Sequence, residues 1–109
     1  MPDRDLTTSA LASVRGGPVG TAEAGPLAQA LKALGDPVRL RLVSLVAASQ
    51  DGEVTVGRLT DSVPVSAPTV SHHLGVLTRA GLLERRASGR QAYYALAEGR
   101  LDAVAEALR

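Results

Sequence analysis

The chain has 109 residues, which is enough for one small domain. Its formal net charge of +1 excludes a protein that is basic all over, so affinity for nucleic acid must come from a local patch. The sequence contains no cysteine, which excludes disulfides, zinc–thiolate sites and thiol redox sensing. No apolar run approaches the roughly 20 residues of a membrane span and no signal peptide is visible, so we expect a cytoplasmic protein.

The N-terminal segment, residues 1–23, mixes Gly, Pro, Ser and Thr without a sustained apolar period, which predicts a flexible arm. We expect residues 24–109 to form the folded domain. Its first helix is predicted at 24–34, where apolar residues recur at helical spacing and Pro26 suits the first turn.

The second helix is predicted to start at Asp36-Pro37, with Asp as the N-cap and Pro in the first helical position. Its apolar residues lie on more than one side, which indicates a central helix. Residues 53–56 are short and β-prone, and Thr55 is a candidate cap for a short helix at 56–63, which Pro64 ends.

Ser66 is predicted to cap the next helix, whose apolar residues Val70, Leu74 and Leu77 recur at helical spacing. The hairpin that follows is predicted from residues 82–87 and 90–96 around Ser88-Gly89. A last helix covers roughly 98–108. The order α-α-(β)-α-α-β-β-α predicts a mainly α fold with a small β-hairpin.

Two short helices joined by a tight turn at 63–66 match the helix-turn-helix plan, in which the second helix enters the major groove. The hydroxyl groups at the start of that helix can donate to phosphates or base edges. We therefore predict that 24–109 is a winged helix-turn-helix domain for DNA binding and dimerisation, with recognition helix 66–80 and wing 82–96. The predicted DNA contacts are Ser66, Ala67, Thr69, Ser71, His72, Arg86 and Arg90.

The two histidines are adjacent, and adjacent helical side chains diverge by about 100°, so a shared metal ion is disfavoured. His72 falls on the outward side with Thr69, and His73 falls nearer the apolar side as a half-buried packing residue. Arg39 and Arg41 are interpreted as ordinary surface charges, with phosphate contacts as the alternative. Tyr93 and Tyr94 must point to opposite faces of their strand, as must Arg85 and Arg86.

Three motifs in order resemble the ArsR/SmtB group of winged-helix repressors, over about residues 26–108. They are LKALGDPVRLRLVSLV (31–46), APTVSHHLGVLTRAGLL (67–83) and GRQAYYAL (89–96). The resemblance implies a homodimer paired through its first and last helices. It also implies binding to double-stranded operator DNA that is relieved by an effector, classically a metal or metalloid ion.

The chain departs from this family where the effector would bind. Thr55-Val56-Gly57 replaces a Cys-x-Cys, and Gly16-Gly17 replaces a vicinal cysteine pair. Asp51 stands roughly where some members carry a further cysteine. Asp102-Ala103-Val104 keeps the Asp of the other common site but lacks its His. Since thiolate and imidazole ligands are missing, we predict no metal site and no cofactor, and a small effector is left open.

Two alternatives share the fold. One is an arsenical- or metal-resistance repressor whose thiols have been replaced. The other is a protein–protein module that kept the fold without binding DNA, which Ala67, where many relatives carry Gln, and the modest net charge both favour. An enzyme is disfavoured, because no nucleophile–base pair, phosphate loop or carboxylate pair is evident.

Overall fold

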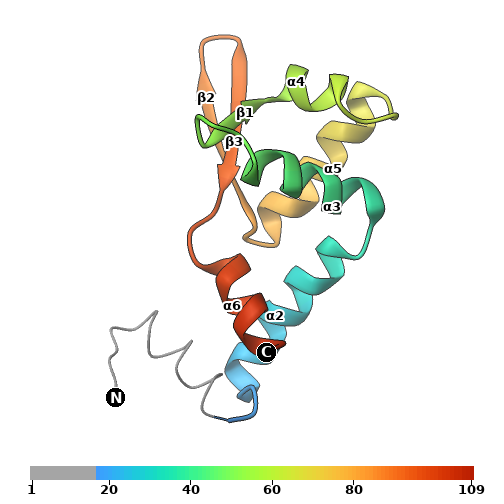
Figure 1. The fold of residues 1–109 in the computed structure, drawn as a ribbon. Helices are drawn as coiled ribbons and strands as arrows, with labels where there is room; N and C mark the ends of the chain where they lie inside the picture. Colours follow the sequence, from blue (N-terminus) through green and yellow to red (C-terminus); the bar gives the residue numbers. More distant parts are fainter. Residues whose placement is uncertain (1–16) are drawn as a thin grey trace.

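The computed structural model describes residues 17–109, so most of the predicted arm, residues 1–16, lies outside the described part. The elements and their bounds are α2 (Thr21–Leu34), α3 (Pro37–Ala47), β1 (Glu53–Thr55), α4 (Val56–Asp61), α5 (Ala67–Arg79), β2 (Leu83–Ser88), β3 (Gln91–Leu96) and α6 (Arg100–Ala107). This order confirms the predicted mainly α fold with a β-hairpin (Figure 1).

Helix α2 begins at Thr21, three residues before the predicted start, so Pro26 lies inside the helix and not in its first turn. Proline has no N–H to donate to the carbonyl four residues earlier, which here belongs to Ala22. Both residues are exposed, so water can satisfy that carbonyl and the helix continues. The inward face of α2 carries Leu27, Ala30 and Ala33.

Helix α3 starts as predicted. The carboxylate of Asp36 accepts hydrogen bonds from the backbone N–H groups of Val38 (2.9 Å) and Arg39 (3.1 Å), and Pro37 follows the cap. The Arg39 N–H is the largest cause that lowers the pKa of Asp36, because it stabilises the ionised carboxylate. One face of α3 is buried, whereas Leu40 on another face is 55% exposed.

The strands form one antiparallel sheet in the order β1-β3-β2, so the β-prone segment before α4 adds a third strand to the hairpin. Ser88 pairs with Gln91, which makes Gly89-Arg90 the two-residue turn, one position later than predicted. Gly89 has φ +62°, a left-handed conformation that glycine adopts without steric cost.

The core combines buried side chains of α2, α3, α4, α5 and α6 with those of β2 and β3. Tyr94 belongs to it, while Tyr93 is half-buried on the other face of β3, as the alternation of strand residues predicts. Helices α2 and α6 lie side by side away from the hairpin. Over residues 17–109, no helix combines the length and apolarity needed to span a bilayer. The largest fully buried side chains are Leu42, Leu59, Leu74, Leu77, Leu82, Leu83, Val46 and Val70.

Candidate nucleic-acid interface

Helices α4 and α5 form the helix-turn-helix unit, joined by residues 62–66. The hydroxyl of Thr55 caps α4 by accepting the Arg58 N–H at 3.3 Å, as predicted. Ser66 caps α5 by accepting the Thr69 N–H at 3.4 Å. Val63, within this connection, is buried in the hydrophobic core and so anchors the turn.

The two faces of α5 differ sharply in exposure. Val70, Leu74 and Leu77 are each 0% exposed and anchor the helix in the core. The predicted contact residues Ser71 and His72 are exposed on the opposite side. Ala67 is also exposed, and its small side chain leaves the first turn open for close approach to a partner. The structure thus leaves all three of these predicted contacts accessible to a partner.

The other two predicted contacts at the start of α5, Ser66 and Thr69, are hydrogen-bonded to each other. The hydroxyl oxygens of Ser66 and Thr69 lie 3.0 Å apart. A hydroxyl donates one hydrogen, so in this pair one residue donates to the other and the second keeps its own hydrogen. The pair therefore retains one O–H donor for a phosphate or a base edge.

The histidines separate as helical phase predicts. Their ring centroids are 5.8 Å apart, with His72 exposed and the His73 side chain 13% exposed. His73 is half-buried as predicted, but its ring nitrogens lie close to polar groups. Its Nδ1 lies 3.2 Å from Nη1 of Arg39, and its Nε2 lies 4.0 Å from Oδ2 of Asp36.

The interpretation of Arg39 as an ordinary surface charge was wrong. Its Nε donates to the carbonyl of Ala33 at 2.6 Å, so the half-buried side chain joins the end of α2 to α3 and, through His73, to α5. Local spacing contains no signal for this contact, because His73 is 34 positions away. Arg41 is exposed, as predicted, and its Nε reaches the Ser62 carbonyl at 3.4 Å.

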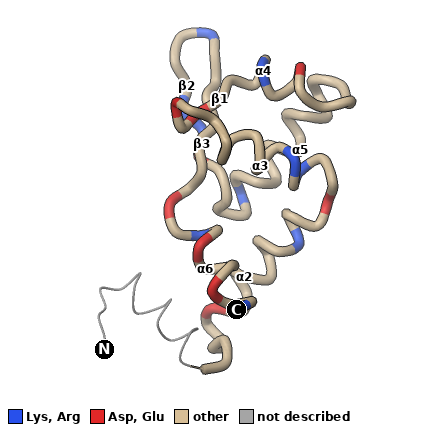
Figure 2. The backbone as a smooth tube through the Cα atoms, in the orientation of Figure 1, with Lys and Arg blue, Asp and Glu red and all other residues tan. Residues whose placement is uncertain are grey.

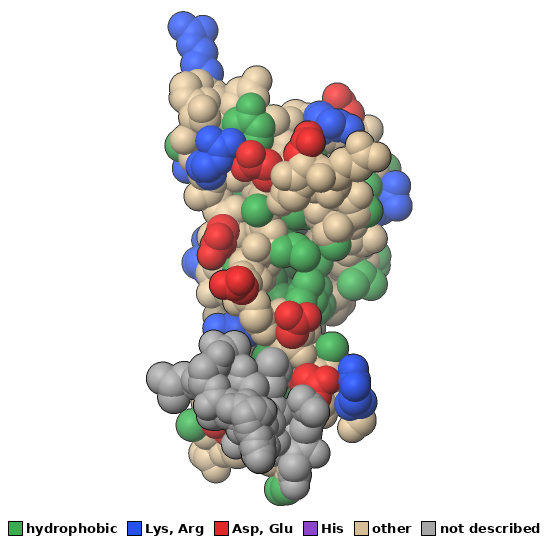
Figure 3. All heavy atoms as spheres, turned by 60° about the vertical axis from the view of Figure 1, so that its left-hand side comes forward, with side chains coloured by type: hydrophobic (Ala, Val, Ile, Leu, Met, Phe, Trp, Pro, Cys, Tyr) green, Lys and Arg blue, Asp and Glu red, His purple; other side chains and the backbone are tan. Residues whose placement is uncertain are grey.

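The arginines of the hairpin differ in how they are held. Arg90 stands in the turn, and basic residues mark the hairpin tip in Figure 2 and project beyond it in Figure 3. Arg86 instead makes two hydrogen bonds to the carboxylate of Glu53, at 3.1 and 2.9 Å. Its guanidinium also lies 4.5 Å from the ring centroid of Tyr93. These hydrogen bonds raise the pKa of Arg86, because Glu53 stabilises the charged form.

The residues at the positions where the resemblance implies metal ligands do not form a ligand set. Thr55 is the cap of α4, Gly57 has no donor side chain, and Asp102 is exposed on α6. Within residues 17–109, no three His, Asp or Glu side chains gather into a group that could hold a metal ion. Gly16 lies outside the described residues. The donor set of residues 17–109 does not fit a thiolate or zinc site.

Comparisons with known proteins agree with this geometry. A family described as a helix-turn-helix domain matches residues 34–86. The biofilm growth-associated repressor of Xylella fastidiosa is 38% identical over 85 residues, which cover 78% of this chain and 72% of that protein. The transcriptional repressor SmtB of Mycobacterium tuberculosis is 40% identical over 82 residues, covering 71% of this chain and 58% of that protein. The crystal structure of a possible transcriptional regulator for arsenical resistance matches with a TM-score of 0.63 at 39% identity, over 71% of this chain and 76% of the other.

Proposed function

Because the chain belongs to the ArsR/SmtB family of winged helix-turn-helix regulators, we propose that it is a homodimeric repressor of transcription that binds double-stranded operator DNA in the cytoplasm. The observation that carries this proposal is the exposed N-terminal half of α5. Ser66 caps this helix, small and polar side chains cover its outer face, and an arginine-tipped hairpin follows it.

In the proposed complex, α5 lies in the major groove. Ser71 and His72 reach base edges, and the Ser66–Thr69 hydroxyl pair donates to a phosphate. Ala67 allows close approach at the first turn. Arg90 at the hairpin tip contacts the flanking backbone or minor groove.

Arg86 is a weaker candidate for a DNA contact than Arg90. Its guanidinium is bound to Glu53 and lies against the ring of Tyr93. A contact between Arg86 and DNA requires that the Glu53 bonds be exchanged for bonds to phosphate, which offsets part of the gain.

The proposed dimer pairs α2 and α6 across a two-fold axis. An apolar stripe on α2 (Ala24, Ala28 and Leu31) and another on α6 and its C-cap (Leu101, Ala105 and Leu108) each repeat at i, i+4 and i+7. Leu31 is 41% and Leu108 is 68% exposed in the single chain. A second copy would remove this apolar surface from water.

The first test replaces Ser71 and His72 together with alanine, after an operator has been selected from a random DNA pool. We expect operator affinity to fall at least about tenfold, since base contacts are lost. Stability should change by less than about 0.5 kcal/mol per residue, because both side chains are exposed. Fluorescence anisotropy and urea denaturation measure the two quantities.

The matched control is Ser44→Ala, the same change at an exposed serine of α3. Equal affinities of the double variant and the wild type would reject the assignment of Ser71 and His72. Failure of the wild-type protein to enrich any DNA sequence would reject operator binding and favour the protein–protein module. Release from the operator by micromolar arsenite, cadmium or zinc, with a defined stoichiometry, would support the alternative hypothesis of an arsenical- or metal-resistance repressor.

A further inference from the structure

We propose that the cavity between the end of α3, β1 and α4 binds a small organic monocarboxylate with an apolar body, and that this ligand weakens operator binding. The cavity has a volume of about 360 Å³, within the range of small-molecule sites. The binding half of the proposal stands on the cavity alone, whereas the regulatory half rests on the proposed function.

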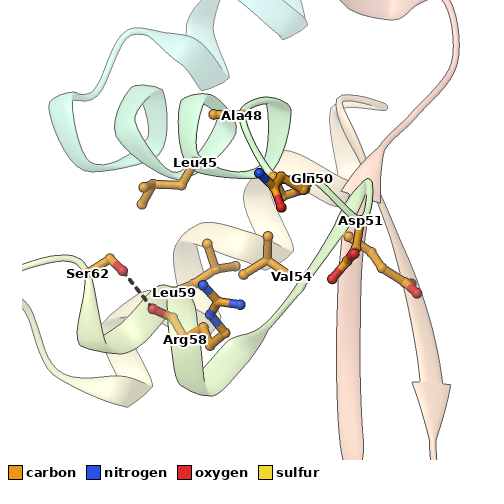
Figure 4. Close-up of a pocket in the computed structure, with 10 residues that line it drawn as sticks. Leu45, Ala48, Gln50, Asp51, Val54, Arg58, Leu59 and Ser62 are labelled. Atoms are coloured by element: carbon orange, nitrogen blue, oxygen red, sulfur yellow. Dashed lines mark hydrogen bonds between the residues drawn. The ribbon is translucent and has the colours of Figure 1, made fainter.

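The floor of the cavity is apolar and is built from three elements. Leu45 comes from α3, Val54 from β1 and Leu59 from α4, and Figure 4 shows all three around the hollow. Leu59 is 1% exposed and ties the floor to the core, while the other two are half-buried. A bound apolar group would cover the exposed parts of these side chains and so gain burial.

Three charged side chains line the cavity: Glu53 is already neutralised, whereas Arg58 and Asp51 have no ion-pair partner among residues 17–109. Glu53 is neutralised by its two hydrogen bonds from Arg86. The side chain of Arg58 has no hydrogen-bond or ion-pair partner among residues 17–109, and Figure 4 shows its guanidinium beside Val54 and Leu59. The positive charge next to the apolar floor is therefore available to a ligand.

These charges select the class of ligand. A guanidinium matches a carboxylate in size and planarity and can bind it with two parallel hydrogen bonds. The amide of Gln50, which also lines the cavity, offers further donors. Asp51 lies toward the other side of the cavity and would repel a second carboxylate (Figure 4). The lining thus favours a monocarboxylate, held by Arg58 beside the apolar floor, over a dicarboxylate.

The position of the cavity connects the ligand to DNA binding. Helix α4 is the first helix of the helix-turn-helix unit, and Arg58 lies on it. A carboxylate bound there cancels one positive charge of this unit, which lowers its attraction for phosphates. The ligand would also bridge α3, β1 and α4, and so resist any adjustment of α4 on the operator. We expect operator affinity to fall several-fold when the cavity is filled.

The binding test uses the full chain without DNA and isothermal titration calorimetry. The probes are benzoate and hexanoate, compared with adipate, benzylamine and hexylamine. We expect saturable binding of the monocarboxylates at one site per chain. Arg58→Gln should weaken that binding at least about tenfold, because a charge-assisted pair is lost. Arg85→Gln, on β2 and outside the cavity lining, is the matched control and should bind like the wild type.

The outcomes separate the two halves of the proposal. Absence of saturable binding by benzoate and hexanoate, or equal binding by Arg58→Gln and wild type, overturns the site. Preferential binding of the amines that is lost in Asp51→Asn overturns the carboxylate assignment. Monocarboxylate binding that leaves operator affinity unchanged overturns the regulatory role. If the ligand-free protein binds no operator, the proposed function fails while the calorimetric result still decides the site.

Discussion

Arg39 illustrates how one side chain can join three helices. Its Nε donates to the carbonyl of Ala33 near the end of α2, and its Nη1 meets Nδ1 of His73 on α5. Its own helix, α3, begins one residue after the Asp36 cap, and Oδ2 of that carboxylate lies 4.0 Å from the other nitrogen of His73. The cluster therefore holds α5, the proposed recognition helix, against α2, the helix proposed for dimerisation.

At this scale we predict that Arg39→Gln destabilises the protein by about 1–3 kcal/mol, since charge-assisted hydrogen bonds of a half-buried group are lost. Urea denaturation measures the change. Arg41→Gln, the same substitution at an exposed arginine two positions away, should cost no more than about 0.5 kcal/mol. Equal costs for the two variants would refute a joining role for Arg39.

At the scale of one element, the strand register of the hairpin determines which of its arginines are bound within the protein and which are accessible. The register places Arg86 opposite Tyr93, on the face where Glu53 of β1 can reach it, and places Arg85 opposite Tyr94 on the other face. Arg90 occupies the turn and is exposed. In the wing, Arg86 therefore joins β1 to the hairpin, and Arg90 stays accessible at the tip.

The prediction for the wing concerns the salt dependence of operator binding. Each phosphate contact contributes about 0.9 to the slope of log affinity against log salt. Arg90→Gln should therefore make the slope shallower by about one. Arg86→Gln should leave the slope nearly unchanged, because its charge is already bound to Glu53. Anisotropy titrations over a range of salt concentrations measure both, and a larger effect at Arg86 would reverse the assignment.

At the scale of the molecule, the described part of the chain, residues 17–109, is elongated, with principal extents of 45 × 24 × 20 Å. The hairpin lies at one end and the α2–α6 pair toward the other, and Figure 3 shows uncovered apolar side chains along the middle of one face. The exposed leucines of α2 and α6 are Leu31 and Leu108. An elongated chain with such leucines is suited to bury them against a second copy.

For the assembly we predict that Leu31→Glu combined with Leu108→Glu raises the dimer dissociation constant at least about 100-fold. Each change acts twice across a two-fold axis and replaces an apolar contact with a charge. Analytical ultracentrifugation measures the constant, and circular dichroism verifies the fold. Leu40→Glu, at an exposed leucine of α3, is the control and should remain dimeric. If the control dissociates as readily, the interface involves α3 instead.

Local sequence was sufficient for most of the elements. Asp36, Thr55 and Ser66 each cap a helix as predicted, because a cap depends on residues within three positions of it. The apolar spacing of α5 identified its buried face for the same reason. The errors of one to three residues, at the start of α2 and in the hairpin turn, lie where neighbouring positions offer similar local signals.

Contacts between distant residues were decided only by the tertiary structure. Sequence alone determined the helix-turn-helix plan, the outward face of α5 and the lack of thiol ligands. It could not show that Arg39 meets His73 or that Glu53 binds Arg86, since these partners are 34 and 33 positions apart. The cavity beside Arg58 also depends on how α3, β1 and α4 pack together. Periodicity and capping act over a few residues, whereas partners and cavities arise from packing between elements.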